Sequence, residues 1–470
     1  MPTTAEQLAA LVSSVTGAPL PVGLRAWDGS EVPAGYRAGV GAPAARTGSG
    51  TAGDPADAPT VVVTSRRALR RMLWSPGELG AAEAYLSGDL QVEGDLAAGL
   101  SAVWQAHQSG AGGHGVRVRD YPRLITAAAR LGAVGPRPPV PGAGERTGRA
   151  RLSGRRHTRA RDRAAISYHY DLSNEFYEFL LDESMAYSCG YFAQAPADPA
   201  AAAAALPDAQ RAKLDLICRK LGLHEGARHL DIGCGWGSLI CHAAEHYGTV
   251  STGVTLSKQQ HEYVTRRVAA AGLQDRVTVR LSDYRDLALA ADDQGAYDAV
   301  STIEMGEHVG EAEYPEFARI LAAMVRPGGR VLVQQMSRGT FSPNTTAGGG
   351  AFIETYIAPD MHMKPLATTA GLLAGAGLEV RDVHALREHY TWTAQAWLQV
   401  LETHWDQAVA LIGEVGARVW RLYLAGGALA FAENRMGVDQ ILSVRPGSDG
   451  AADLPPTRAG WEPTAVTPGR

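Results

Sequence analysis

The stretch that most constrains the fold is residues 229–237, which read His-Leu-Asp-Ile-Gly-Cys-Gly-Trp-Gly. A short apolar strand leads into Asp231, glycines follow at every second position from Gly233 to Gly237, and Ser238 opens a segment of helical character. Glycines at a strand-to-helix turn let the backbone approach a ligand where any Cβ would clash. The stretch therefore predicts a ligand-binding turn.

The spacing of these glycines points to the kind of ligand. Dinucleotide-binding turns usually read G-x-G-x-x-G, whereas this turn reads D-x-G-x-G-x-G, the usual form in S-adenosylmethionine (SAM) methyltransferases. The amino-acid end of SAM carries an ammonium and a carboxylate in place of a pyrophosphate, so the loop need not cradle phosphate. A purely structural glycine-rich turn is the alternative.

Strand and helix patterns alternate on both sides of the turn. Strands are expected at 229–232, 249–256, 277–281, 297–303 and 331–336, and helices at 209–221, 257–271 and 311–325. This alternation predicts an α/β fold, a Rossmann-like doubly wound parallel sheet of the class I SAM-methyltransferase type. Ligands of such sheets bind outside the carboxyl ends of the strands. That rule gathers 233–237, 255–260, 283–284 and 303–308 around one pocket.

With 470 residues, the chain has room for two or three domains. Residues 1–131 are expected to form a small α+β domain, and the Pro-, Gly- and Arg-rich residues 132–165 a linker. Residues 166–445 form the methyltransferase domain, which ends in a helix at 419–434 and a strand at 437–444. The Pro-, Gly- and Asp-rich tail 446–470 is expected to be disordered. On composition alone, an oligomerisation or cap domain is the alternative for the first domain, which leaves a homodimer open.

Composition excludes several classes of protein. The net charge of −5 argues against a nucleic-acid-binding protein, and the four cysteines form no C-x-x-C pair, so neither a zinc site nor a disulfide framework is expected. No metal is predicted. The N-terminus lacks the basic start and apolar run of a signal peptide, and no apolar run approaches 18 residues. We expect a cytoplasmic protein whose membrane contact, if any, is peripheral and at the inner face.

An arginine-rich run crosses the expected linker, with Asp162 as its one acidic residue; it comprises Arg146, Arg149, Arg151, Arg155, Arg156, Arg159, Arg161 and Arg163. Near lipid headgroups each such cation contributes roughly 1 kcal/mol. No aromatic residues interleave with the arginines, which disfavours nucleic acid as the partner. The run predicts contact with an anionic membrane surface, and a solvated, disordered linker is the alternative.

Six separated motifs resemble one family. They are residues 168–177, 187–192, the glycine turn, 253–257, 307–310 and His389-Tyr390. Together they resemble the cyclopropane-fatty-acyl-phospholipid synthase family over about residues 166–445. Residues 77–90 are similar to the small N-terminal domain of the phospholipid-acting members. The resemblance therefore implies a lipid-handling role for residues 1–131.

The resemblance also implies where SAM binds. The methionine part would meet the glycine turn, the ribose would lie at the end of the second strand, and the adenine would lie at the end of the third. The residues implied are Tyr187, Ser188, Asp231, Gly233, Gly235, Gly237, Thr255, Leu256, Gln260, Asp283, Tyr284 and Ile303.

The family's reaction places the SAM methyl group on a cis double bond in a lipid acyl chain. An isolated alkene is a poor nucleophile, so such a site must align the reactants and exclude water. Aromatic faces can stabilise the cation that forms. The substrate-binding residues implied are Tyr168, Tyr191, Phe192 and Tyr356, and the partners are the acyl chains of phospholipids.

The chain departs from the family at the base. Cyclopropane-forming relatives hold a bicarbonate ion with Cys, Glu, His and Tyr side chains, and here Cys189, Glu307 and Tyr390 match. Gln334 stands where those relatives carry His, and Glu304 where they carry Gly. We hypothesise that the carboxylate of Glu304 replaces bicarbonate as the proton acceptor, aided by a pKa raised by burial. The alternative is that Glu304 bonds a loop amide.

A relocated base favours a different product. We expect a mid-chain methylene branch, which a flavin- or nicotinamide-dependent reductase would convert into a 10-methyl fatty acid. The cyclopropane ring, made from the same substrate, is the alternative product. A non-catalytic lipid-binding protein and a methyltransferase for a small soluble acceptor also stay open.

Overall fold

The computed structural model describes residues 1–16, 18–37, 58–109, 121–143, 148–150, 152–170, 173–287, 293–338 and 349–461. The chain divides into two compact units. The first comprises residues 1–149 and 413–429, and the second comprises 150–412 and 430–470. Within the described ranges, no helix is both long and apolar enough to cross a bilayer.

The first unit is a small α+β structure. Its sheet has the order β2-β1-β3-β4, in which only the β1–β3 pair is parallel. The strands are β1 (Gly23–Arg25), β2 (Glu31–Val32), β3 (Thr60–Val63) and β4 (Leu90–Glu93), and the helices are α1 (Thr4–Thr16), α2 (Arg67–Trp74), α3 (Glu78–Leu86), α4 (Leu96–Ser109) and α5 (Tyr121–Arg130). Leu8, Leu24 and Val63 lie in its core. The sequence predicts helices at 4–16, 65–74 and 95–107 and a strand at 60–64, whereas β1 and β2 are too short to show a strand pattern.

One segment of the first unit comes from the far end of the chain. Helix α16 (Trp405–Ala432) is interrupted at Gly413, whose φ of 76° and ψ of 162° are not helical. Beyond this point, Trp420 is buried, and Arg421 donates a 3.2 Å hydrogen bond to the hydroxyl of Tyr85. The sequence assigns residues 413–429 to the methyltransferase domain because the helical pattern does not show which unit a helix packs against.

The second unit is built on a seven-stranded sheet of order β10-β11-β9-β8-β5-β6-β7. The strands from β9 to β7 are parallel, whereas β11 runs antiparallel to both of its neighbours. The strands are β5 (Arg228–Ile232), β6 (Val250–Thr255), β7 (Val277–Leu281), β8 (Tyr297–Ile303), β9 (Val325–Arg338), β10 (Glu379–Ala385) and β11 (Met436–Val444). The doubly wound sheet is confirmed, with one antiparallel strand added.

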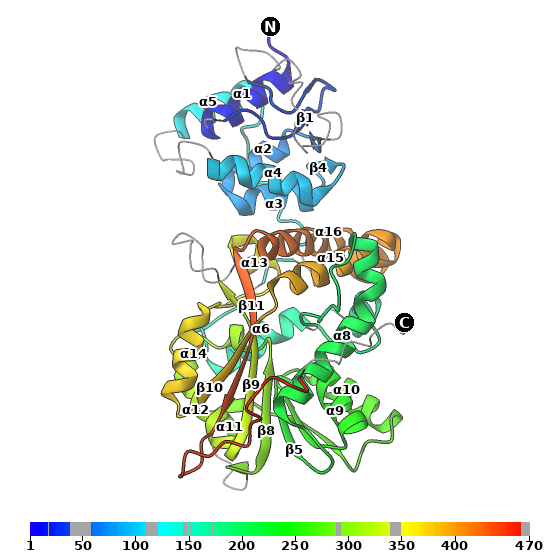
Figure 1. Ribbon diagram of the computed structural model, residues 1–470. Coiled ribbons are helices and arrows are strands. Elements are labelled where there is room, and N and C mark those ends of the chain that lie inside the picture. Colours follow the sequence, from blue (N-terminus) through cyan, green and yellow to red (C-terminus); the bar gives the residue numbers. More distant parts are fainter. Residues whose placement is uncertain are drawn as a thin grey trace. The chain divides into compact units, whose positions relative to one another are not determined.

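Helices cover both faces of this sheet (Figure 1). The helices of the unit are α6 (Arg159–Tyr170), α7 (Asn174–Leu180), α8 (Pro199–Leu221), α9 (Ser238–Tyr247), α10 (Lys258–Ala270), α11 (Tyr284–Leu287), α12 (Tyr314–Met324), α13 (Ala351–Tyr356), α14 (Leu366–Gly375) and α15 (Arg387–Thr403). Successive strand residues point to opposite faces. Thus Val331 and Val333 pack with α12 and α14, whereas Leu332 packs with α8 and α9.

Helix α8 begins ten residues earlier than the sequence indicates. The carboxylate of Asp198 accepts from the backbone N–H of Ala201 at 2.7 Å, and Pro199 occupies the first helical turn. Both are ordinary helix-start signals. The apolar periodicity that marks the helix only becomes visible further along, because the first turns are a run of alanines.

The tail expected to be disordered makes specific contacts as far as Trp461, although most of its residues are exposed. This tryptophan is 6% exposed and lies against Leu442 and its neighbours in the second unit. The Nε of Arg330 also donates to the carbonyl oxygen of Asp453 at 3.0 Å. The prediction of disorder came from the average composition of the tail, which is dominated by Pro, Gly and Asp. One buried tryptophan barely changes that average, although its packing is enough to hold the segment in place.

Candidate active site

The glycine turn lies between β5 and α9, and its three glycines serve different purposes. All have positive φ: 85° at Gly233, 53° at Gly235 and 81° at Gly237. A Cβ on Gly237 would come within 2.7 Å of Val264, so this glycine permits helix packing. A Cβ on Gly235 would meet no described atom within 4 Å, because its position faces open space.

A pocket opens beside this turn at the carboxyl edge of the sheet. Ten of the twelve residues assigned to the cofactor line it: Tyr187, Ser188, Asp231, Gly233, Gly235, Thr255, Leu256, Gln260, Tyr284 and Ile303. Thr255 donates a 2.8 Å hydrogen bond to the side-chain oxygen of Gln260, which makes a polar end to β6. Burial raises the pKa of Asp231 to about 6, although Ser301 donates a 2.6 Å hydrogen bond to its carboxylate. Gly237 and Asp283 are not among the lining residues.

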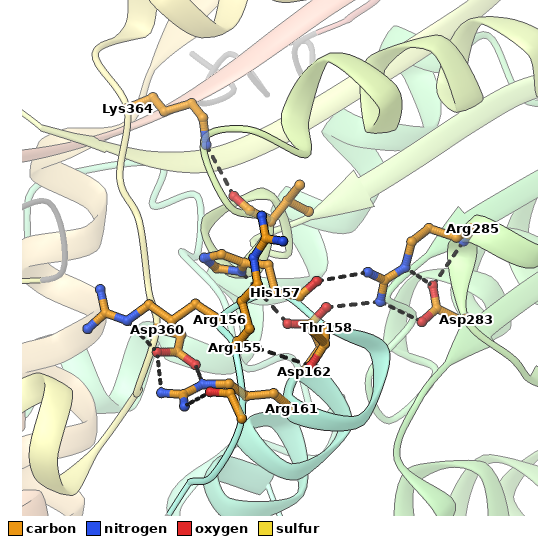
Figure 2. A network of polar contacts seen from close by, with 12 residues as sticks. Arg155, Arg156, His157, Thr158, Arg161, Asp162, Asp283, Arg285, Asp360 and Lys364 are labelled. Carbon is orange, nitrogen blue, oxygen red and sulfur yellow. Dashed lines mark hydrogen bonds and ion pairs between the residues drawn. The ribbon is translucent and has the colours of Figure 1, made fainter.

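Asp283 is instead tied to an arginine (Figure 2). Arg285 donates to the two carboxylate oxygens of Asp283 at 2.8 and 2.7 Å, and one of its Nη groups donates to Asp162 of α6 at 2.9 Å. Its guanidinium also lies 5.3 Å from the ring centre of Tyr284. Arg285 and Asp162 line the pocket, and sequence reasoning missed both as site residues. They join α6 to the adenine end of the expected cofactor site.

Three of the residues assigned to catalysis, Cys189, Gln334 and Tyr390, meet at a fourth, Glu304, which directly follows β8. Its Oε1 accepts hydrogen bonds from the backbone N–H of Cys189 at 2.9 Å and from the amide of Gln334 at 2.8 Å. Its Oε2 accepts from the hydroxyl of Tyr390 at 2.6 Å. Burial raises the pKa of Glu304, and these three donors counteract the increase. Of the five residues assigned to catalysis, only Glu304 lines the pocket.

The backbone of Glu304 takes a conformation that suits glycine, the residue that the resemblance implies at this position. Its φ is 53°, in the left-handed region that residues other than glycine adopt at a cost of about 1 kcal/mol. Strained residues of this kind cluster at functional sites. The strained backbone at Glu304 is thus accompanied by a carboxylate that points into the protein.

The orientation of Gln334 is set from the neighbouring strand. Gln440 of β11 lies directly across from Gln334 of β9 and donates a 2.9 Å hydrogen bond to its side-chain oxygen. The amide nitrogen of Gln334 is therefore the atom left to face Glu304. An amide in this place donates a hydrogen bond to the carboxylate without carrying a charge.

Glu307 is fully buried in a separate environment. Its Oε1 accepts from the backbone N–H of Met336, whereas its Oε2 has no hydrogen-bond partner among the described residues. Burial and the nearby charge of Glu304 raise the pKa of Glu307 to about 8. Cys189 is also buried, which raises the pKa of its thiol well above the usual value. These shifts favour a neutral Glu307 and a neutral thiol.

The four residues assigned to the acyl chain form two separate groups, and none of them lines the pocket. The hydroxyl of Tyr168 donates to the carbonyl oxygen of Tyr356 at 3.2 Å. Tyr191 stacks on His389 at 4.9 Å, and the backbone N–H of Phe192 donates to that histidine at 3.0 Å.

A row of aromatic rings lies closer to the site, and the sequence analysis assigned Tyr187 of this row to the cofactor but gave no role to Trp236 and Trp397. Tyr187 packs 5.3 Å from Trp397 and 5.6 Å from Tyr177, which itself lies 4.5 Å from Trp236. The signal was available: aromatic residues recur along α7 and α15 on their buried faces.

Several arginines of the linker make ion pairs within the protein. Arg161 donates to both carboxylate oxygens of Asp360, at 2.5 and 3.0 Å, and Arg156 lies 3.1 Å from the same carboxylate. Arg159 pairs with Asp286, and within the first unit Arg149 pairs with Glu83. Arg146 and Arg151 lie outside the described residues. Arg155 and Arg163 are exposed and make no ion pair among the described residues, so fewer arginines are unpaired than the sequence alone suggests.

The sheet order, the glycine turn at its carboxyl edge and the polar pocket beside that turn define a class I SAM-dependent methyltransferase. Polar groups at the end of β6, the ring of Tyr284 and the open space at Gly235 fit the ribose, adenine and methionine parts of this cofactor. The chain belongs to the mycolic acid cyclopropane synthetase family, whose sequence profile matches residues 157–441.

Named relatives agree with this assignment. A probable fatty acid methyltransferase of Pseudomonas putida is 35% identical over 453 residues, which cover 96% of this chain and 98% of that protein. Tuberculostearic acid methyltransferase of Mycobacterium tuberculosis is 36% identical over 293 residues, 62% of this chain and 67% of that protein. A mycolic acid cyclopropane synthase solved with S-adenosylhomocysteine (SAH) and CTAB is 29% identical, with a TM-score of 0.54 over 60% of this chain and 98% of that one.

Proposed function

We propose that the enzyme methylates the cis double bond of an unsaturated acyl chain in a phospholipid and that Glu304 collects the proton that leaves. The names of the relatives support a fatty acyl substrate. The observation that carries the proposal is the set of three donors, from Cys189, Gln334 and Tyr390, that converge on the carboxylate of Glu304. The resemblance implies that cyclopropane-forming relatives hold bicarbonate with the corresponding side chains.

The chain's own residues account for the requirements of this chemistry. When bound, SAM supplies an electrophilic methyl group. Burial around Glu304 and the rings of Tyr187 and Trp397 exclude water and offer π faces to a developing cation. A carboxylate has about four hydrogen-bonding positions, and three are filled by the protein, so one is left for the substrate proton.

The product depends on whether the proton is lost before or after a hydride shift. Methyl addition to one alkene carbon leaves a cation on the other. Direct loss of a proton from the new methyl group closes a cyclopropane ring. A hydride shift first moves the cation to the methyl-bearing carbon, and proton loss from the methyl group then gives a methylene branch. We infer the methylene product. The carboxylate of Glu304 is part of the chain, so it meets the substrate at a different position from a bound bicarbonate ion. A separate reductase would be needed to saturate it.

The experiment is to incubate the enzyme and SAM with liposomes of dioleoyl phospholipid and to analyse the extracted fatty acids by NMR. Vinylidene protons identify the methylene product, and upfield ring protons identify the cyclopropane. The matched variant Glu304→Gln should lower kcat by about 100- to 10,000-fold while SAH binding persists. Full activity in this variant would exclude Glu304 as the base. Methylation of a soluble amine or alcohol with no lipid product would contradict the substrate class.

We also propose that exposed arginines of residues 152–163 contact an anionic membrane surface. Arg155 and Arg163 are the exposed members for which no ion pair is found among the described residues. Sedimentation with liposomes containing anionic lipid tests this contact. The double variant Arg155→Gln with Arg163→Gln should sediment less, and unchanged sedimentation would contradict the proposal.

A further inference from the structure

Lys213 is a buried lysine in the wall of the cofactor pocket, and no role was assigned to it from the sequence. It lies on α8, is 1% exposed and lines the pocket together with Ser188, Asp231 and Gly233. Its Nζ donates a 2.6 Å hydrogen bond to the hydroxyl of Ser188. No carboxylate oxygen of the described residues lies within 4.0 Å of this ammonium group.

The other buried lysines of this unit have a carboxylate or an aromatic face beside them. Lys220 lies 3.5 Å from the carboxylate of Asp382. Lys364 lies 4.3 Å from the ring centre of Tyr314 and donates to the carbonyl oxygen of Val309 at 3.2 Å. A buried charge is expensive unless it is paired. Lys213, with a single hydroxyl as partner, is therefore suited to receive an anion from the pocket.

The surroundings of Lys213 hold its ammonium group in place. Gln210, one turn earlier on α8, donates to the carbonyl oxygens of Ser188 at 2.9 Å and Ala186 at 3.2 Å. These bonds fix the segment 186–189, which carries two of the residues assigned to the cofactor. Burial lowers the pKa of Lys213, and the more distant charges of Glu304 and Asp231 oppose that shift. An anion bound in the pocket would therefore further stabilise the charged form of Lys213.

We infer that Lys213 binds the α-carboxylate of SAM. The amino-acid end of SAM is a zwitterion, and the pocket wall next to the glycine turn offers a cation at Lys213 and an acid at Asp231. The inference rests on the cofactor and not on the identity of the lipid product. Its failure and the failure of the proposed lipid reaction are therefore distinguishable.

The test is a binding cycle measured by isothermal titration calorimetry. Two ligands are compared: SAH, and its aminopropylthio analogue, which keeps the amine and lacks the carboxyl group. Wild-type enzyme should prefer SAH by about 10- to 100-fold, the range expected for a hydrogen bond to a charged group. In Lys213→Met the preference should fall to about 2-fold or less.

Lys220→Met is the matched control, because it removes another buried lysine of α8 that does not line the pocket. It should retain the wild-type preference for SAH. Equal binding of both ligands by the wild-type enzyme would overturn the inference without any variant. A folded Lys213→Met protein that still prefers SAH would also overturn the inference. The lysine would then affect only the charge of Glu304 or the stability of the fold.

Discussion

The hydroxyl of Tyr390 donates a 2.6 Å hydrogen bond to Oε2 of Glu304, although 86 residues separate the two in sequence. The ring of Tyr390 is held in place by stacking on Phe431 at 4.3 Å. The carboxylate is therefore not a loose side chain at the mouth of a pocket. Its ionisation is set by donors from β9, α15 and the segment that precedes α8.

Removing the Tyr390 hydroxyl should alter the pH dependence of the reaction. Burial already raises the pKa of Glu304, and Glu304 must be ionised to accept a proton, so activity increases as pH rises through this pKa. Tyr390→Phe removes a donor that favours the ionised form. The acidic limb of kcat should therefore move to higher pH, by about one to two units for a bond to a charged group.

The measurement is kcat against pH at saturating SAM and lipid. Tyr247→Phe is the control, because it removes a hydroxyl that donates to Asp215, which does not line the pocket. An acidic limb that stays in place in Tyr390→Phe would show that Glu304 does not govern it.

Replacing Glu304 by glycine should make the enzyme dependent on an added anion. Glycine accepts the left-handed φ of 53° without strain, and the donors of Cys189, Gln334 and Tyr390 remain. Without bicarbonate, kcat should fall by at least about 100-fold, and added bicarbonate should restore part of it. The assay is lipid methylation in carbon-dioxide-free buffer with and without bicarbonate. Glu304→Gln keeps the space filled and should show no recovery, and equal recovery in both variants would argue against this site.

Breaking the arginine link at the adenine end should weaken cofactor binding. Arg285→Met leaves the buried carboxylate of Asp283 without its ion pair and frees Asp162 of α6. We expect the Kd for SAH to rise by about 10-fold. Calorimetry of SAH binding measures the change. Arg280→Met removes the pair with Asp293 outside the pocket and should leave the Kd within about 2-fold, whereas an unchanged Kd in Arg285→Met would contradict a role for the link.

Truncating the buried tryptophan of the tail should destabilise the second unit. Trp461 is 6% exposed, and large-to-small substitutions of buried aromatic residues cost about 3–5 kcal/mol. Trp461→Ala should therefore lower the free energy of unfolding by a few kcal/mol in urea titrations followed by circular dichroism. Leu281→Ala, at a residue that is 49% exposed, is the control. Equal stability of the two variants would show that Trp461 contributes little.

Much of the sheet was predictable because its signals are local. The strands that became β5 to β8 show apolar runs bounded by turns or caps, and Ser257 caps α10 by accepting a hydrogen bond from the N–H of Gln260, as its position predicts. The order of the parallel strands then brings Gly233, Thr255 and Ile303 to one edge. This is why most of the expected cofactor residues line one pocket.

What could not be predicted depends on contacts between distant segments. Arg285 meets Asp162 across 123 residues, and no periodicity marks such a pair. Lys213 did leave a signal, since it, Gln210 and Lys220 are polar residues on the mostly apolar buried face of α8. Whether they hold a loop or bind a ligand is decided by Ser188, which lies in a different segment.

The interruption of α16 at Gly413 means that neither compact unit corresponds to an uninterrupted stretch of the gene. A clone that ends at residue 149 discards Trp420 and Leu424, which are buried, and removes the partner of the Tyr85 hydroxyl. A clone that begins at residue 150 keeps residues 413–429 without the unit that they complete. Shuffling of the first unit between related enzymes must therefore exchange two separate coding segments together.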